Sequence, residues 1–219
     1  AETPAAPIAL NAWIHIGTDD LVTIYIDKSE MGQSILTGLA MIAADELDCD
    51  WKKVRTEFAP ADKVYINPRF GVQGTGGSSG TPTSWTPLRK ASATARQLLI
   101  AAAAQKWGVP PTECRAENST IVHTPTKRNL TYGSLADAAA KLPVPQSGVT
   151  LKEPGQYHLI GQPFKRLDTP LKVNGSAQYG IDVRQPGMLY AVVARCPVFG
   201  GKVASFDPVK AKAISGEIG

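Results

Sequence analysis

Lys28-Ser29-Glu30-Met31-Gly32-Gln33-Ser34 is the stretch that decides how this chain folds. It is a polar turn containing a glycine, and it stands between two apolar segments. Before it, Leu21–Ile26 alternates apolar and polar side chains over much of its length, which indicates a β-strand. After it, apolar residues recur at helical spacing from Ile35 to Leu47. The stretch is therefore predicted to be a loop that joins a strand to a helix.

The segments on either side extend this pattern. Ala12–Ile16 is a second alternating run, and Gly17-Thr18-Asp19-Asp20 separates it from Leu21–Ile26, which predicts a β-hairpin. In the helix, Asp45, Glu46 and Asp48 fall to one side, so we expect an amphipathic helix with one buried face. Val54–Ala59 then predicts a strand that ends at Pro60.

A second loop of similar chemistry follows about forty residues later, at Gly74-Thr75-Gly76-Gly77-Ser78-Ser79-Gly80. It lies in the aperiodic segment Asp62–Thr83, and loops of that length are usually functional or disordered. An alanine-rich helix is predicted directly after it, over Ser84–Trp107, closed by Gly108 and Pro110. The strong helix argues that the loop is ordered. The two loops are predicted to form two walls of one binding site.

The rest of the chain predicts smaller elements. Cys114–Ala116 and Thr120–His123 form a hairpin, and a helix starts at Ser134 as its N-cap and runs to Leu142. Prolines and glycine then mark a boundary, so we divide the chain into a lobe at 1–150, a connector at 151–165 and a second module at 166–219. The overall class is α+β. The second module is predicted to contain three strands and a helix capped by Asp207, over Ala177–Tyr179, Met188–Arg195, Lys202–Phe206 and Asp207–Ile214.

Composition bounds the function classes. The chain has 219 residues, with 43% hydrophobic and 19% charged residues, which is typical of a globular protein. A net charge of +4 is too small and dispersed to indicate nucleic-acid binding. No apolar run approaches the roughly 20 residues that span a bilayer. The three cysteines Cys49, Cys114 and Cys196 are widely spaced, so neither a disulfide framework nor a metal site is predicted.

The local chemistry of the two loops leaves two interpretations open for each. A glycine-rich loop before a helix presents backbone N–H groups and the positive end of the helix dipole, which suits a phosphate. Gly76 and Gly77 permit close approach, while Ser78 and Ser79 add hydroxyls. The sequence matches neither the Walker pattern nor GxGxxG. A plain surface turn is the alternative.

In the first loop, Gln33 carries an amide that can pair with the edge of a pterin or base. Gly32 permits the backbone to approach a flat ring, and Met31 offers a polarizable contact. The alternative is a helix start that binds no ligand.

Taken in order, the two loops resemble those of the large molybdenum subunit of the xanthine dehydrogenase/aldehyde oxidase family, of the isoquinoline 1-oxidoreductase β-subunit type. In this type the Glu-Met-Gly-Gln loop precedes the hammerhead domain, as Glu30–Gln33 does here. In xanthine dehydrogenases the loop follows the hammerhead domain. The residues from 166 onward resemble the start of that α/β-hammerhead. Further matching stretches are Asp45-Glu46-Leu47, Asp50-Trp51, Tyr65-Ile66-Asn67-Pro68, Trp85 with Leu88-Arg89, Tyr132-Gly133, Arg166-Leu167-Asp168, Lys172-Val173-Asn174-Gly175 and Pro186-Gly187-Met188-Leu189-Tyr190-Ala191.

The resemblance implies a molybdopterin cofactor with molybdenum, in the cytosine dinucleotide form. Carried over by position, Met31, Gly32 and Gln33 contact the pterin, while Gly76, Gly77, Ser78 and Ser79 contact its phosphate region. One position departs from the family: Ser34 stands where a glycine often follows the glutamine. A Cβ disfavours positive φ, so we expect Ser34 to avoid that conformation.

The resemblance also implies a function. The chain is expected to be the N-terminal part of a molybdenum hydroxylase that oxidises an aldehyde or N-heteroaromatic with water as oxygen donor. Its expected partners are the remainder of the large subunit, a small [2Fe–2S] subunit and an electron acceptor such as a cytochrome. The family's general-base glutamate is expected beyond Gly219, so no catalytic residue is assigned here. The alternatives are a non-catalytic module that binds a nucleotide or another subunit, and a processed structural fragment.

The start of the chain bears on location. Ala1-Glu2-Thr3-Pro4-Ala5-Ala6-Pro7 is a small-residue tract without an initiating methionine, which is typical of an exported protein after signal removal. Relatives of the isoquinoline type commonly carry a twin-arginine signal. We therefore expect a periplasmic protein.

Overall fold

The computed structural model describes residues 7–145 and 148–215. The chain divides into two units, residues 1–177 and 178–219, and each is described by itself. The first unit combines helices with a mixed sheet, so the predicted α+β class is confirmed at that level. Among the described residues, no helix has the length and apolar character needed to cross a membrane.

A four-stranded sheet forms the centre of the first unit, in the order β1-β2-β3-β4. Its strands are β1 (Ile8–Ala9), β2 (Ile14–Ile16), β3 (Val22–Ile26) and β4 (Val54–Phe58). β2 and β3 pair antiparallel, which confirms the predicted hairpin, and β4 is the predicted strand. β3 and β4 pair in parallel, with Val22 opposite Val54 and Ile26 opposite Phe58. Parallel pairing requires a crossover connection, and the helix between the two strands supplies it.

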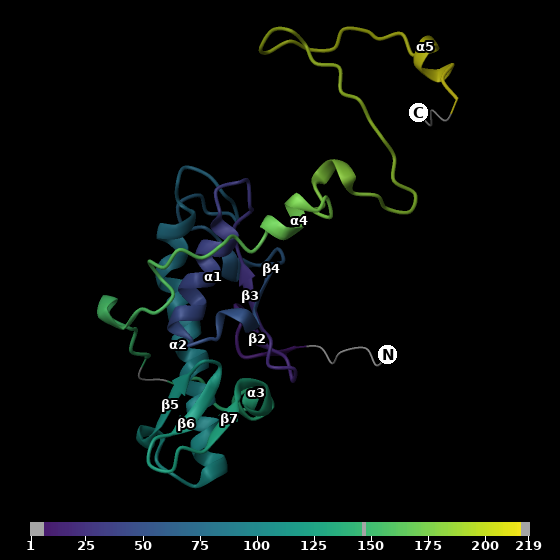
Figure 1. The fold of residues 1–219 in the computed structure, drawn as a ribbon. Coiled ribbons are helices and arrows are strands. Elements are labelled where there is room, and N and C mark those ends of the chain that lie inside the picture. The colour runs from purple at the N-terminus through teal and green to yellow at the C-terminus, as the bar shows by residue number, and fades with distance from the viewer. Residues whose placement is uncertain (1–6, 146–147, 216–219) are drawn as a thin grey trace. The chain divides into compact units, whose positions relative to one another are not determined.

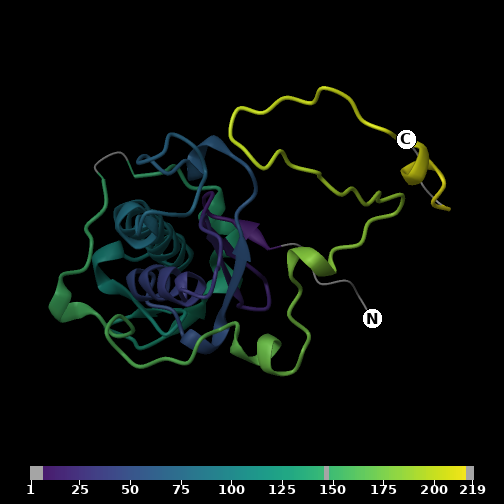
Figure 2. The ribbon, with the colours of Figure 1, turned by 90° about the horizontal axis from the view of Figure 1, so that it is seen from above.

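That crossover helix is α1 (Ile35–Glu46), and it packs beside α2 (Gly80–Trp107) on one face of the sheet (Figure 2). The core between helices and sheet is fully buried; Ile24, Leu39 and Leu88 have no exposed surface. α2 begins four residues before the predicted Ser84. Its 28 residues are about 42 Å long at 1.5 Å per residue.

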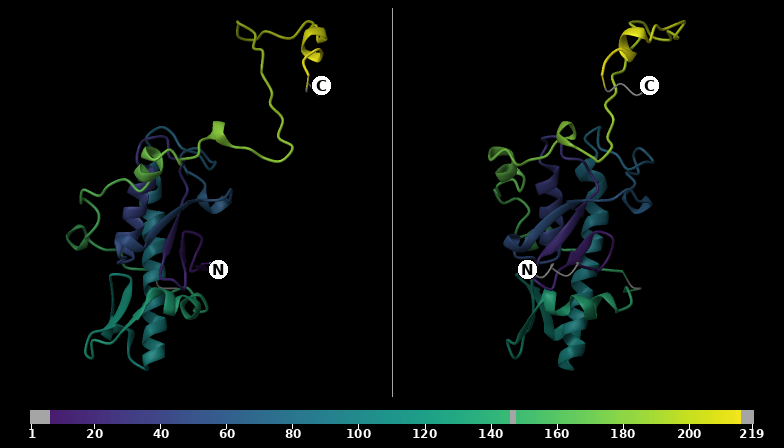
Figure 3. Two further views of the ribbon diagram at one scale, coloured as in Figure 1. Left: turned by 45° about the vertical axis from the view of Figure 1, so that its right-hand side comes forward. Right: turned by 90° about the vertical axis from the view of Figure 1, so that its right-hand side faces the viewer.

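The length of α2 lets it support two sheets (Figures 1 and 3). Its N-terminal half lies beside the four-stranded sheet, and its C-terminal half contacts a second sheet and α3 (Tyr132–Ala140). The predicted hairpin of 114–123 is confirmed in that second sheet, with one more strand. The N-cap of α3 is Thr131, whose side chain accepts from the Ser134 N–H, so the predicted cap at Ser134 was wrong by one turn. The second sheet consists of β5 (Cys114–Glu117), β6 (Thr120–His123) and β7 (Asn129–Thr131).

The acidic side of α1 is buried, contrary to the expectation of an amphipathic helix. Asp45 and Glu46 are each 1% exposed. Glu46 pairs with Arg89 Nε at 2.8 Å and with Arg96 at 3.3 Å, both on α2. The arginines supply the opposite charge that the buried Glu46 carboxylate needs.

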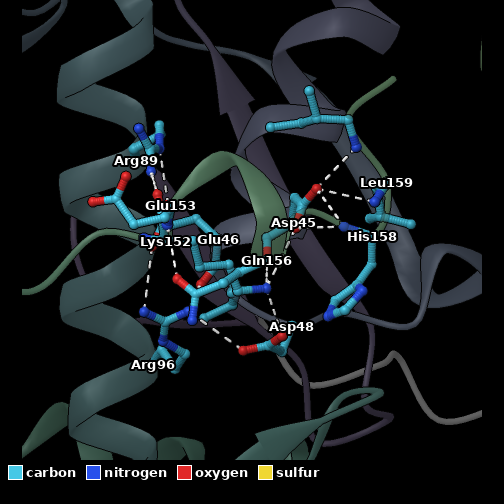
Figure 4. A network of polar contacts seen from close by, with 12 residues as sticks. Asp45, Glu46, Asp48, Arg89, Arg96, Lys152, Glu153, Gln156, His158 and Leu159 are labelled. Carbon is cyan, nitrogen blue, oxygen red and sulfur yellow. Dashed lines mark hydrogen bonds and ion pairs between the residues drawn. The ribbon is translucent and has the colours of Figure 1, made fainter. Parts of the chain in front are cut away.

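The connector supplies the remaining partners of these acids (Figure 4). The Lys152 N–H donates to Glu46 Oε1 at 2.9 Å, and Lys152 Nζ lies 2.6 Å from Asp48 Oδ1. Asp45 accepts the backbone N–H groups of three successive residues, 158, 159 and 160, at 2.8–3.2 Å. Aperiodic in sequence, the connector is therefore fixed by hydrogen bonds from its backbone to α1.

Short helical turns complete the first unit. They are η1 (Trp51–Lys53), η2 (Lys63–Tyr65), η3 (Pro111–Glu113), η4 (Pro154–Gln156) and the short helix α4 (Thr169–Val173).

The second unit, in its described residues 178–215, contains only η5 (Gly180–Asp182) and α5 (Val209–Lys212). The strands predicted over Met188–Arg195 and Lys202–Phe206 are wrong for this structure, as is that over Ala177–Tyr179 at the boundary. A strand forms only with a hydrogen-bonded neighbour, and no described segment of this unit provides one. Its apolar side chains stay exposed as a result. The predicted helix over 207–214 is confirmed only in α5. Its N-cap is Pro208, so the predicted cap at Asp207 was wrong by one residue, although Asp207 Oδ1 accepts the Val209 N–H at 3.0 Å. The assignment of a hammerhead domain stays a prediction, as does the division of the chain into a lobe at 1–150, a connector at 151–165 and a second module at 166–219.

Candidate functional site

The two predicted loops leave the same edge of the sheet. The first follows the carboxyl end of β3 and the second follows that of β4; because these strands are parallel, both ends lie at one edge. The loops are joined directly: the Ser29 N–H donates to Thr75 Oγ1 at 2.8 Å. Ligands of open α/β sheets bind at such edges.

A hollow of about 370 Å³ lies between the two loops. All of the predicted site residues except Gly32 line it. The remaining lining comes from Thr75, Ile35 and the first turn of α2. The complete lining is Met31, Gln33, Ile35, Thr75, Gly76, Gly77, Ser78, Ser79, Gly80, Thr81 and Pro82.

Two helix N-termini meet at this hollow. A Cβ placed on Gly80 would lie 3.1 Å from Ile35 Cδ1, so the first turns of α1 and α2 are in contact. The helices run in the same direction, because Glu46 at the end of α1 pairs with Arg89 and Arg96 further along α2. The positive ends of both helix dipoles therefore face one place, which favours an anion.

At α1, a carboxylate of the chain already occupies the N-terminus. Glu30 Oε1 accepts the N–H groups of Gly32 at 2.7 Å and Ser34 at 3.1 Å, and Oε2 accepts that of Leu36 at 3.1 Å. Burial opposes the charge of Glu30, but these backbone hydrogen bonds and the Arg166 charge outweigh it and lower its pKa below the ordinary value. Glu30 is therefore ionised at neutral pH and caps α1. Sequence reasoning placed it in the loop without a role.

At α2, the loop keeps its N–H groups available. Within the described residues, those of Gly76, Gly77 and Ser78 have no hydrogen-bond partner. Ser78 is exposed, with φ +52°. Ser79 differs: it is 1% exposed, and its hydroxyl donates to the Gly76 carbonyl at 2.7 Å while accepting from Asn67. Its hydroxyl holds the loop in shape, and the available donors are the three N–H groups and the Ser78 hydroxyl.

Gln33 closes its own loop. Its Oε1 accepts the Met31 N–H at 2.6 Å, and its Nε2 donates to the Ser29 carbonyl at 2.8 Å. One N–H and one lone pair of the amide remain for a ligand. The Met31 side chain is 66% exposed beside it.

Ser34 contradicts the expectation drawn from its Cβ. It has φ +66° and ψ +23°, in the left-handed region. This conformation costs a non-glycine residue about 1 kcal/mol. The bond from its N–H to Glu30, together with that of Leu36, fixes the turn on both sides and imposes the conformation.

Three residues that support the loops had no role in the sequence-based prediction. Asn67 is fully buried and donates to Ser79 Oγ at 2.9 Å and to the Gly74 carbonyl at 3.2 Å. Arg69 donates to the Gly77 carbonyl at 3.0 Å, and Arg166 reaches the first loop from 134 residues downstream. Asn67 and Arg166 had a signal, because each belongs to a stretch that resembles the family, whereas Arg69 had none.

Comparison with known proteins shows which family the chain resembles. The model of the molybdopterin cofactor-binding domain family matches residues 3–183. The beta subunit of isoquinoline 1-oxidoreductase from Brevundimonas diminuta is 35% identical, over 98% of this chain and 32% of the relative. A protein of Gluconacetobacter polyoxogenes named membrane-bound aldehyde dehydrogenase [pyrroloquinoline-quinone] is 34% identical, over 94% of this chain and 26% of its own length.

A third relative is the B subunit of nicotinate dehydrogenase from Pseudomonas putida, 31% identical over 90% of this chain and 16% of its own length. The chain thus spans a third or less of the curated relatives it matches. The family match covers both loops, both long helices and the connector, so this chain belongs to the molybdopterin cofactor-binding domain family.

Proposed function

We propose that the hollow between the two loops holds the phosphate-bearing part of a molybdopterin cofactor in its cytosine dinucleotide form. The observation that supports this most is the meeting of two parallel helix N-termini at a hollow with three available N–H groups, on Gly76, Gly77 and Ser78. A cationic ligand gains nothing from that arrangement, whereas phosphate oxygens accept such donors and interact favourably with the positive end of the α2 dipole.

The donor set fits the cofactor in kind. The second loop offers N–H groups for phosphate oxygens, and the first loop offers an exposed thioether at Met31 and the remaining amide positions of Gln33 for a flat heterocycle. Glu30 caps α1 and is shielded by Arg166, so its charge is compensated within the protein and does not repel the phosphate. Gly32 contributes its backbone to the first loop without lining the hollow.

We further propose that this chain is the N-terminal part of the large subunit of a molybdenum hydroxylase. That enzyme would oxidise an aldehyde or N-heteroaromatic. When bound, the cofactor supplies two-electron redox chemistry with water as the oxygen donor. This chain's residues bind and orient the cofactor, and none is assigned to the reacting atoms. The proposed partners are the rest of the large subunit, a small [2Fe–2S] subunit and an electron acceptor such as a cytochrome, in keeping with the names of two relatives, which describe subunits.

Location is proposed from sequence alone. A periplasmic protein accords with the tract Ala1–Pro7, of which residues 1–6 lie outside the described residues. Osmotic-shock fractionation of the producing cells tests this, with the protein expected in the released fraction.

Metal and nucleotide analysis of the intact enzyme tests the proposed function. We expect molybdenum and, on acid release, a cytidine nucleotide in a one-to-one ratio. An enzyme purified with neither would contradict the proposal and favour a binding module without redox chemistry.

Gln33→Ala is expected to reduce molybdenum occupancy while leaving the thermal midpoint unchanged. The side chain is exposed, so its loss costs the core nothing, but the first loop loses the two bonds that Gln33 makes to the Met31 N–H and the Ser29 carbonyl. Molybdenum per protein measures the effect. Gln162→Ala, an exposed glutamine outside the hollow, is the matched control. Equal molybdenum occupancy in both variants would show that the Gln33 side chain does not contribute to cofactor binding.

A further inference from the structure

Arg166 connects a downstream segment to the first loop. Its Nη1 donates to the Gly32 carbonyl at 3.0 Å, and its Nη2 donates to Glu30 Oε1 at 3.1 Å. The same guanidinium forms a two-pronged pair with Asp168, at 2.9 and 2.8 Å. Beside it, the Leu167 N–H donates to Thr37 Oγ1 on α1 at 3.0 Å. All of these contacts lie within the first unit.

The fork geometry of the guanidinium is what these contacts use. The edge with Nε and Nη2 binds Asp168, while Nη1 and Nη2 reach the loop, so the planar group sets the distance and angle between Asp168 and the loop. Asp168 is in turn held by Lys172 Nζ at 2.5 Å, and the two cations lower the pKa of Asp168 well below its usual range. A charged Asp168 therefore fixes Arg166 at neutral pH.

The bond to Gly32 sets the orientation of one peptide group. Gly32 has φ +100°, and a glycine, which has no Cβ, has little intrinsic preference for one backbone conformation. The C=O and N–H of a trans peptide point in opposite directions, so holding the Gly32 carbonyl at Arg166 turns the Gln33 N–H away from it. Among the described residues, the Gln33 N–H has no partner, and Gln33 lines the hollow while Arg166 does not.

We propose that Arg166 is a positioning residue for cofactor binding, which orients the Gly32–Gln33 peptide and compensates the charge of Glu30 beside the hollow. This rests on the proposed function of the hollow. The segment after residue 165, which resembles the start of the hammerhead domain, then has a second role. It holds the cofactor loop of the preceding lobe in place.

The test uses the assembled enzyme that contains this chain, loaded with cofactor, and measures the rate at which molybdenum appears in the filtrate after dilution. Arg166→Ala is expected to release it about tenfold faster, because the loop loses two hydrogen bonds to a charged donor. Arg166→Lys keeps the charge and the fold but lacks the fork, and it is expected to release the metal faster than wild type as well.

Lys172→Gln is the matched control, because it removes a cation from Asp168 without touching the loop. It is expected to release molybdenum at the wild-type rate. Equal acceleration by Lys172→Gln and Arg166→Ala would indicate general loosening of the segment and overturn the inference. Wild-type retention in Arg166→Lys would overturn it too, since the fork would then be dispensable.

The proposed function and the positioning role are overturned by different results. A wild-type enzyme without molybdenum overturns the proposed function. A loaded wild-type enzyme whose release rate is unchanged by Arg166→Ala overturns the positioning role alone.

Discussion

Glu46→Ala is expected to lower the free energy of unfolding by about 3–5 kcal/mol, the range measured when one partner of a buried ion pair is removed. Glu46 is 1% exposed and pairs with two arginines of α2, whose side chains are 9% and 15% exposed. Its loss removes the carboxylate that pairs with the buried Arg89, while Arg96 keeps Asp48 at 3.3 Å. It also removes the acceptor of the Lys152 N–H.

Urea denaturation of the 219-residue chain, followed by far-UV circular dichroism, measures this effect. Asp137→Ala is the control, because the Asp137–Lys141 pair lies on the surface with both side chains more than 70% exposed. A change within about 0.5 kcal/mol is expected there. The same small change in Glu46→Ala and Asp137→Ala would show that the buried ion pairs of Glu46 contribute little to the stability of the chain.

Gly133→Ala has the second largest expected effect, a destabilisation of about 2–3 kcal/mol from overpacking and a lost hydrogen bond. A Cβ on Gly133 would lie 2.6 Å from the Gly17 carbonyl oxygen and 3.0 Å from the Asp20 nitrogen. Both are backbone atoms of the β2–β3 turn, which cannot yield as a flexible side chain would. The Gly133 N–H also donates to Asp20 Oδ1 at 2.8 Å, and that bond cannot survive the displacement.

Gly38→Ala in α1 is the matched control for this substitution. A Cβ there meets no atom within 4 Å, so the change should stabilise the chain by about 0.5–1 kcal/mol through helix propensity. The two substitutions add the same methyl group to a helix and are expected to have opposite signs. Stabilisation by Gly133→Ala would show that α3 does not pack closely on the β2–β3 turn.

Local patterns were enough to predict the elements around the site. Alternation gave β2, β3 and β4, helical spacing gave α1, and alanine content gave α2, all within a few residues. The pairing of β3 with β4 could not be predicted from the sequence. A parallel pair joins strands separated by a helix, so no short turn motif marks it. That pairing is what brings the two loops to one edge, so the prediction of two walls rested on the similar chemistry of the loops and on the helix predicted after each.

The polar contacts inside the site were the part that sequence reasoning missed. Glu30 caps α1 through three backbone N–H groups, and Arg166 contacts Glu30 across 136 positions. Such partners depend on the tertiary fold and have no local spacing. The same holds for Asp45 and Glu46, which a helical pattern assigns to solvent and which the connector and α2 bury.

Local propensity also failed where strand formation depends on a neighbour. Val192 is 99% exposed and Val203 is 83% exposed in segments whose composition predicts strands. β-propensity measures how well side chains fit a half-buried sheet, and without a neighbouring strand it has no effect. Ser34 shows the reverse case, in which backbone hydrogen bonds to Glu30 override the local preference of a residue with a Cβ.

A crystal structure of the complete large subunit, with its cofactor present, tests the proposed cofactor site most directly. We expect phosphate oxygens at about 2.7–3.2 Å from the backbone nitrogens of Gly76, Gly77 and Ser78, between the N-termini of α1 and α2. A cofactor located elsewhere, with these three N–H groups facing water or another part of the protein, would contradict the proposal.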